Sequence, residues 1–335
     1  MKARFAKLHG SLGLWLGICV IFSGCGTVKV PVKVTHPAEI NMAKYKQVAI
    51  SRIDGNLGNA FADDLKGRLV ESGKFTLVDR ARLDQIMREL NLSNSDLVQS
   101  NKAAKLGKLL PATAIITGRA DGRYEEKMTF METTCYRDKM KYPCQACTRT
   151  GTYLTGGSID VIDVATAQIL KSKSLEFRCQ GSTNATGATC EAIDVSGLTS
   201  YCVDQNVTRF IKAITPWTEF VQAPFQTDGD LPNLEAGVNM AKIGDMQGAA
   251  DTFRAAASSA EMNPKVGPKT IAKAYFNLGL AYQYSDEFGK AMEAFKKSYI
   301  LDPSDATANE IKQCEKLQRE KRKLDEHNQG AERGK

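Results

Sequence analysis

Residues 75–90, FTLVDRARLDQIMREL, decide the fold class of the N-terminal half of this chain. The composition of the first four residues, Phe75 to Val78, predicts a short β-strand. From Arg80 on, apolar residues recur at helical spacing and share one helix face, namely Leu83, Ile86, Met87 and Leu90. A strand that passes directly into an amphipathic helix is typical of an α/β fold.

The alternation of strand and helix continues on both sides of this stretch. Upstream we predict a strand at 47–53, a turn at Gly55–Gly58, and a helix with Phe61, Leu65 and Leu69 on one face, ended by Gly73. Downstream we predict one or two helical turns at 102–109, a strand at 114–117, a hairpin of 159–164 with 169–177, and a helix at 206–214. The sequence therefore predicts an α/β (α+β) domain with a mixed sheet over residues 45–215.

The first 25 residues indicate the compartment. Lys2, Arg4 and Lys7 precede an apolar run from Leu12 to Phe22, which is too short for a stable transmembrane helix and is followed by Ser-Gly-Cys25. This order resembles a bacterial lipoprotein signal, which implies removal of residues 1–24 and a diacylglycerol on Cys25. In that family, Gly26 in place of Asp implies the outer rather than the inner membrane. We expect a lipid-anchored outer-membrane lipoprotein facing the periplasm, with an ordinary secretory signal as the alternative.

Composition and histidine content restrict the chemistry. The chain has 335 residues and a formal net charge of +7, part of it in the signal and the C-terminal tail. The mature body is thus only mildly basic, and no nucleic-acid partner is expected. The three histidines are His9 in the signal, His36 near the N-terminus and His327 in the tail, so none is expected in a folded core. We therefore predict no enzyme, no metal site and no cofactor.

Six of the cysteines gather in one region of the mature chain: Cys135, Cys144, Cys147, Cys179, Cys190 and Cys202. In an exported protein, three disulfides are the favoured interpretation, although the sequence cannot give their connectivity. Cys144 and Cys147 also have the CxxC spacing of redox and zinc sites. A zinc site would need a second pair at similar spacing, and a redox pair would need a helix N-terminus, so both remain alternatives.

The N-terminal domain resembles the curli assembly/transport (CsgG-type) lipoproteins. The resemblance covers roughly residues 45–215 and is carried by the motifs 75–80, 83–90, 114–118 and 161–166. It implies a compact periplasmic α/β domain. It also implies homo-oligomerisation, because the best-known member forms a ring whose subunits each insert two hairpins into a secretion barrel.

Whether this chain builds such a channel depends on two cysteine-bearing stretches, at about 120–156 and 176–204, which correspond to the inserting hairpins of the family. A membrane strand needs about 9–11 residues with one apolar face. In the first stretch Glu126 and Glu132 interrupt the better face, and the second has almost no apolar face. We expect water-exposed, disulfide-braced insertions, and a channel subunit is kept as the alternative.

The second half of the chain resembles a tetratricopeptide repeat. The matching core positions are Tyr275, Leu278, Gly279, Tyr282, Ala291, Phe295 and Pro303, and a weaker copy includes Gly237 and Phe253. We expect a tether at 25–44, a linker at 216–231, all-α repeats with a capping helix at 232–324, and a disordered tail at 325–335. A plain helical hairpin pair without a binding role is the alternative.

In such repeats the first helix of each pair lines a groove that binds a protein or peptide. The corresponding positions are Lys273, Phe276, Leu280 and Gln283, which predict an apolar groove with a basic rim. Packing of this face onto the chain's own α/β domain is the alternative. The sequence thus predicts a non-enzymatic envelope scaffold that binds a partner through its repeats. An oligomeric secretion channel and a thiol–disulfide protein using Cys144 and Cys147 are the rivals.

Overall fold

The computed structural model describes residues 26–333, except 94–95, 98, 111–112 and 187–188. The predicted signal peptide at 1–24 and the predicted lipidation site Cys25 lie outside the described residues. The described chain forms two compact units. The repeat unit contains 26–34 and 220–318, and the α/β unit contains 35–219 and 319–333.

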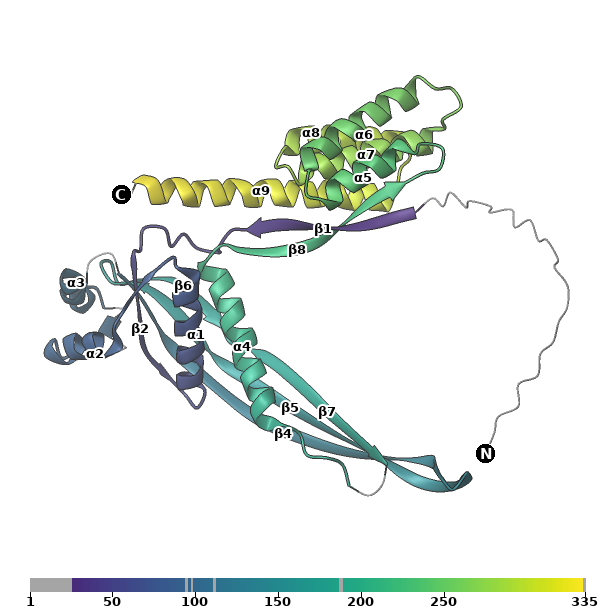
Figure 1. Cartoon of the computed structure of the whole chain (residues 1–335). Helices are drawn as coiled ribbons and strands as arrows, with labels where there is room; N and C mark the ends of the chain where they lie inside the picture. The colour runs from purple at the N-terminus through teal and green to yellow at the C-terminus, as the bar shows by residue number, and fades with distance from the viewer. Residues whose placement is uncertain (1–25, 94–95, 98, 111–112, 187–188, 334–335) are drawn as a thin grey trace, which may run out of the picture. The chain divides into compact units, whose positions relative to one another are not determined.

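The α/β unit is built on a six-stranded mixed sheet, which confirms the predicted fold class (Figure 1). Its strand order is β3-β2-β4-β5-β6, and β7 pairs with the free part of β5. β2 is parallel to β3 and β4, whereas β4 and β5 and the partners of β5 are antiparallel. The strands are β2 (Gln47–Asp54), β3 (Thr76–Val78), β4 (Thr113–Arg137), β5 (Met140–Asp163), β6 (Gln168–Ser174) and β7 (Phe177–Thr186).

Helices cover both faces of the sheet (Figure 1). One face packs against α1 (Gly58–Ser72) and α4 (Val195–Ile214), and the other packs against α2 (Arg80–Glu89) and α3 (Ser100–Leu109). Adjacent residues of β2 therefore enter different cores, Val48 that of α1 and α4, and Ala49 that of α2 and α3. Burial on both faces explains the continuous apolar runs in the central strands.

Local signals set several element boundaries as predicted. Gly73 adopts φ 61° after α1, and the Asp79 side chain accepts a hydrogen bond from the Arg82 amide at the start of α2. The hairpin between β5 and β6 turns at residues 164–167. Two helices are longer than predicted, since α3 covers 100–109 and α4 begins at Val195 rather than 206.

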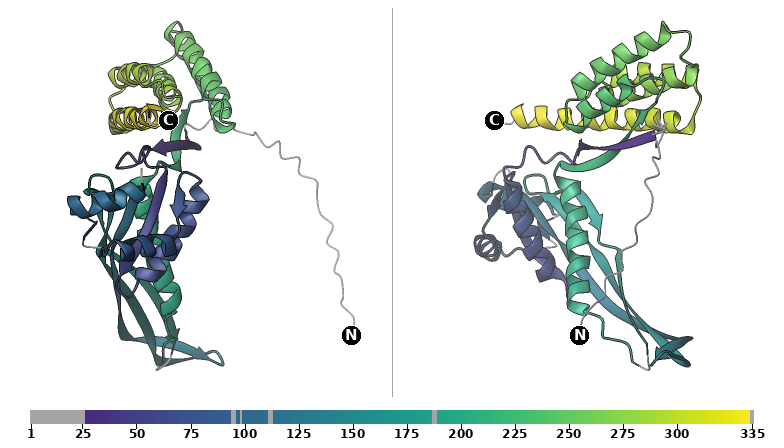
Figure 2. Two further views of the ribbon diagram at one scale, coloured as in Figure 1. Left: turned by 90° about the vertical axis from the view of Figure 1, so that its left-hand side faces the viewer. Right: turned by 45° about the vertical axis from the view of Figure 1, so that its right-hand side comes forward.

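The longest strands run beyond the helices as a narrow sheet, which we call the arm: residues 120–156 with 177–186 (Figures 1 and 2). The β4–β5 hairpin closes at Asp138 and Lys139, which have φ 51° and 66°, as a two-residue type I′ turn requires. The stretch predicted as a first insertion is thus an extension of two sheet strands. The stretch predicted as a second insertion, 176–204, instead divides into β7, a connection and the first half of α4.

The repeat unit contains most of a two-stranded ribbon, four helices and the first half of a fifth, whose residues from 319 on belong to the α/β unit. Residues 26–36, expected to be a tether, form strand β1 (Gly26–His36), and residues 217–227, expected to be part of a linker, form its partner β8 (Trp217–Thr227). Pro31 is exposed within β1, where a two-stranded ribbon tolerates a missing donor. The helices are α5 (Asn233–Lys242), α6 (Met246–Glu261), α7 (Pro268–Gln283), α8 (Phe288–Leu301) and α9 (Asp305–Arg333). α9 is helical through 325–333, where a disordered tail was expected.

The repeat helices pack in pairs through a glycine and an aromatic ring. A Cβ on Gly279 would lie 2.5 Å from the Phe295 ring, and one on Gly237 would lie 2.4 Å from the Phe253 ring. The strong and the weak sequence repeat thus use the same contact. All of the predicted core residues are buried except Pro303, which is exposed between α8 and α9.

Candidate functional site

The residues predicted to line a binding groove are almost all inside the repeat unit. Phe276 is 2% exposed, Leu280 0% and Gln283 1%. Phe276 packs edge-to-face on Phe295, with ring centroids 5.9 Å apart. The prediction that these three side chains form an open apolar groove is wrong, because they belong to the core between the helices. The alternative, packing of this face onto the α/β domain, is not confirmed, because the contacts of Phe276 and Leu280 lie within the repeat unit.

A different side of α7 binds strand β8 through hydrogen bonds. The Asn277 side chain, which is fully buried, accepts a hydrogen bond from the Gln226 amide at 2.7 Å and donates one to the Gln226 carbonyl at 2.7 Å. One turn earlier, Lys273 and Thr270 bind the Asp228 carboxylate at 2.8 and 3.1 Å. Of the four predicted groove residues, Lys273 alone takes part in this contact.

These partners favour the ionised form of the Asp228 carboxylate. Burial alone would raise its pKa, but the Lys273 ammonium, the Asp230 amide and the Thr270 hydroxyl outweigh that effect and lower the pKa. Asp228 therefore stays ionised and bound to α7 at neutral pH. Its 6% exposed side chain shows that this is an internal ion pair.

Apolar residues complete the contact between the ribbon and the helices. Val30, Val32, Ala223 and Phe225 are buried in the same core as α5 to α8. Phe225 stacks on Phe253 with ring centroids 5.6 Å apart. In this unit, then, α7 binds an extended segment of its own chain through main-chain hydrogen bonds, a carboxylate and apolar side chains.

The six predicted disulfide cysteines form three bridges: Cys135–Cys144, Cys147–Cys190 and Cys179–Cys202. Cys144 and Cys147 belong to different bridges. Residues three apart in a strand point to opposite faces and lie about 10 Å apart, beyond disulfide reach. In strand β5 the CxxC pair therefore cannot act as a dithiol. Cys314, a free cysteine, is buried, and burial raises its pKa to about 11.

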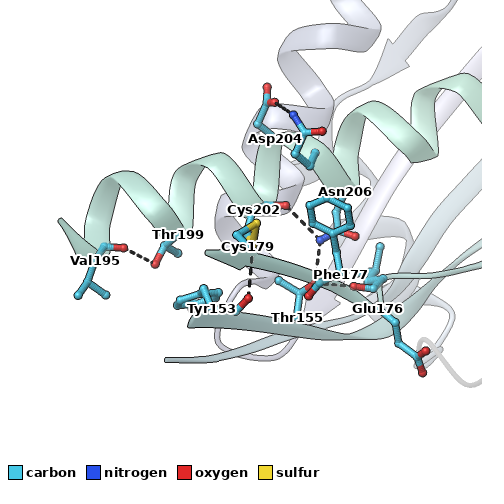
Figure 3. The surroundings of a disulfide bond; sticks show 12 residues. Tyr153, Thr155, Glu176, Phe177, Cys179, Val195, Thr199, Cys202, Asp204 and Asn206 are labelled. Carbon is cyan, nitrogen blue, oxygen red and sulfur yellow. Dashed lines mark hydrogen bonds between the residues drawn. A yellow bond between two sulfur atoms is a disulfide. The ribbon is translucent and has the colours of Figure 1, made fainter. Parts of the chain in front are cut away.

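The Cys179–Cys202 bridge ties the arm to helix α4 (Figure 3). Cys202 also lies 3.7 Å from the Tyr153 carbonyl oxygen of β5, through its Sγ atom. One turn later, Asn206 donates to Thr155 Oγ1 at 2.9 Å and to the Cys202 carbonyl at 3.1 Å. These polar contacts and the bridge join the inner part of the arm to α4, beside the apolar core that contains Tyr153, Cys179 and Cys202.

The outer part of the arm carries exposed apolar and charged side chains. Met131 is 69%, Tyr136 66% and Met140 72% exposed. Because side chains alternate across a strand, Lys127 and Arg137 lie on one face of the arm, and Glu132 and Arg149 lie on the other. Neither face is therefore purely apolar.

Sequence reasoning missed a cluster around His36, which the structure buries in the α/β unit. Its Nδ1 lies 2.8 Å from Glu320 Oε2 and its Nε2 lies 3.1 Å from Glu219 Oε1. The ring stacks on Trp217 at 4.3 Å, and Lys212 lies over that indole. The valine alternation that ends at His36 was the available signal. Within the described chain, no group of three or more metal-binding side chains occurs.

No helix in the described part of the chain is long and apolar enough to cross a membrane. Among solved structures, the chain is similar to the lipoprotein GNA1162 from Neisseria meningitidis. The identity is 10%, the TM-score is 0.23, and the match covers 48% of this chain and 98% of that one. No curated protein matches the chain.

Two family models match parts of the chain. Residues 27–131 match the curli production assembly/transport component CsgG, and residues 272–305 match the tetratricopeptide repeat. Both matches confirm the resemblances drawn from the sequence. The chain therefore carries a CsgG-type domain followed by a tetratricopeptide repeat.

Proposed function

We propose that this protein is a non-enzymatic, lipid-anchored scaffold of the outer membrane, facing the periplasm, that assembles with further copies of itself through its arm. The lipid anchor is assigned to Cys25 from the signal sequence. Three disulfides support an oxidising compartment such as the periplasm. The CsgG-type domain supports an envelope role and oligomerisation.

The observation that carries the proposal is that, among the described residues, each edge strand of the arm has a strand partner on one side alone. β2 pairs with β4 only as far as Arg119, and the loop at Asn56 and Leu57 bonds the main chain of Ala120 and Gly122. From Arg123 to Arg137, β4 pairs with β5. On the opposite edge, the pairing recorded for β7 is with β5. An edge strand presents a row of main-chain donors and acceptors, which is a template for pairing with another chain. The exposed Met131 adds apolar surface to the β4 edge, and the exposed Met140 adds it at the tip of the hairpin.

The repeat binds a segment of its own chain, strand β8. The tetratricopeptide match supports a role in protein interaction. In this chain the strand-binding side of α7 already holds β8, so we do not propose that side as the partner site. The repeat instead stabilises the β1–β8 ribbon.

A secretion-channel subunit is the second candidate, favoured by the CsgG-type domain and by the length of β4 and β5. Two observations weigh against it. Among the described residues, one of the two cysteine-bearing stretches forms a hairpin. Charges such as Lys127 and Glu132 occupy both faces of that hairpin, and a charge on a lipid-facing strand costs up to about 2–4 kcal/mol.

Sizing the lipoprotein extracted in detergent tests the proposal. We expect an oligomer that Met131→Lys dissociates, whereas Val70→Lys on α1 does not. Both wild-type side chains are exposed, at 69% and 60%, so each change adds one charge to a similar surface. A monomer at every concentration, or equal effects of both changes, would contradict assembly through the arm. A ring that conducts ions in a planar bilayer would favour the channel.

A further inference from the structure

Strand β1 fixes where an anchor would emerge from the repeat unit. β1 begins at Gly26, the residue after Cys25, and the Gly26 carbonyl accepts a hydrogen bond from Thr227 Oγ1 at 3.1 Å. Four residues later Val30 is fully buried against the helices. A trans peptide bond keeps successive Cα atoms 3.8 Å apart, so an acyl group on Cys25 would begin beside this end of the ribbon.

Side-chain contacts show which helix ends lie beside the start of β1. Asp228, which directly follows Thr227 at the end of β8, accepts a hydrogen bond from Thr270 in the first turn of α7. Tyr275 lies beside Glu261 and Lys297, while Tyr282 lies beside Arg254 and Lys290. Neighbouring helices are thus antiparallel, and the first turn of α7 lies near the last turns of α6 and α8.

This end, which we call the anchor end, exposes apolar side chains at the last turns of α6 and α8. Met262 is 79% and Ile300 78% exposed, and Lys265 and Lys269 lie in the loop between α6 and α7 and at the start of α7. Single exposed apolar residues are common on protein surfaces. Here they coincide with the point where chain outside the described residues begins.

We infer that the anchor end is a membrane-contacting surface whose partner is the lipid bilayer. This rests on the proposed lipidation of Cys25. The headgroup layer is only about 5–8 Å thick on each side of the hydrocarbon core. With no spacer between the acyl chains and β1, the anchor end lies in or against that layer. An orientation that holds the anchor end away from the bilayer would require the first residues of β1 to separate from β8.

The opposite end of the same unit supplies a matched control. Ile243 at the end of α5 is 78% exposed, as Ile300 is. Gly237 packs on Phe253, so Ile243 lies level with the start of α6. α6 has 16 residues and a length of roughly 24 Å, which separates the two isoleucines along the helix axis.

The test places an indole at each position in the full-length, lipidated protein. Ile300→Trp and Ile243→Trp are reconstituted separately into vesicles of phosphatidylcholine and phosphatidylglycerol, with or without brominated acyl chains. Bromine quenches indole fluorescence at short range. After subtraction of the wild-type emission, we expect the brominated-to-unbrominated ratio to fall well below one for Ile300→Trp and to stay at one for Ile243→Trp.

Mass spectrometry of the same samples distinguishes a failure of the membrane-contacting surface from a failure of lipidation at Cys25. A diacylglyceryl group on Cys25 with equal ratios at both positions would overturn the membrane-contacting surface and leave the anchor intact. An unmodified Cys25 would remove the anchor and with it this inference. Stronger quenching of Ile243→Trp would reverse the assignment of the two ends.

Discussion

Replacing Asn277 with alanine should release strand β8 from helix α7. The Asn277 amide satisfies both main-chain groups of Gln226, each at 2.7 Å, and no water reaches the fully buried side chain. In Asn277→Ala the Gln226 N–H and C=O both lose their partner. A buried donor or acceptor left unsatisfied costs about 1–3 kcal/mol, so the two together give about 2–6 kcal/mol.

Hydrogen exchange followed by mass spectrometry measures this effect in the ribbon itself. Since 1.36 kcal/mol corresponds to a factor of ten, a loss of about 2 kcal/mol increases exchange in peptides covering 220–228 about thirtyfold. Asn239→Ala is the control, because Asn239 is an exposed asparagine on α5 of the same unit. An Asn277→Ala protein whose ribbon exchanges like that of Asn239→Ala would refute the assignment of Asn277 as the residue that holds β8.

The isosteric change Asn277→Asp gives an independent check. At neutral pH its carboxylate can accept from the Gln226 amide but faces the Gln226 carbonyl oxygen without a proton to donate. Protonation of that carboxyl restores a donor. We therefore expect Asn277→Asp to be destabilised at neutral pH and to regain ribbon protection, relative to wild type, as the pH falls.

Four further predictions follow from the described contacts. The double change Phe276→Ala, Leu280→Ala should lower the free energy of unfolding in urea by several kcal/mol, because Phe→Ala in a core costs about 3–5 and Leu→Ala about 2–5 kcal/mol; a curve like that of the wild type would return both residues to a groove. Peptide mapping without reduction should find the three bridges described, and free thiols among the six cysteines would contradict them. Removing Cys147–Cys190 or Cys179–Cys202, with sequence separations of 43 and 23, should lower the free energy of unfolding by about 4 and 3 kcal/mol in the chain-entropy model. The pKa of Asp228 is lower in the folded protein than its value of 3.8 in the unfolded chain, so the ionised carboxylate stabilises the fold above pH 3.8 and loses that contribution as the pH falls below it. Asp228→Asn should therefore be less stable than wild type at pH 7, and acid denaturation should show the difference closing below pH 3.8. Burial raises the pKa of Glu310 above 4.5, so the ionised carboxylate destabilises the folded state. Glu310→Gln should therefore raise the melting temperature at pH 7 and give no gain at pH 4. The amide introduced at position 310 can also donate to the unsatisfied Gln283 Oε1.

The α/β core could be predicted because its signals are local. Residues 75–90 change from strand to helical spacing, and Gly73 ends a helix whose apolar stripe lies in the preceding turns. The ribbon could not be predicted in the same way. Gly26 and Thr227 are 201 residues apart, and Pro216, Pro224 and Gly229 make β8 look like a linker when it is considered alone. The pairing of two such segments is a non-local property.

The predicted groove was wrong because α7 is buried on nearly all sides. A helix that is apolar all round has no stripe to indicate which face meets which neighbour. Repeat positions favoured Phe276, whereas the adjacent Asn277 is the residue that meets β8. A buried asparagine inside the motif YFNLG was the available signal. The stretch 120–156 was predicted as an insertion rather than as an extension of two sheet strands, because neither face of its outer part is purely apolar.

The connectivity of the disulfides has a consequence for how the protein matures. Cys179 lies between Cys147 and Cys190 in the sequence, so the bridges Cys147–Cys190 and Cys179–Cys202 overlap along the chain. A chain that crosses a membrane from its N-terminus exposes Cys147 and Cys179 to oxidant before their native partners arrive. The first bridge open to this pair is a non-native one, which must later be exchanged through a mixed disulfide. If the protein is exported as proposed, its maturation would depend on disulfide isomerisation as well as on oxidation, whereas Cys135–Cys144 can form correctly in order of emergence.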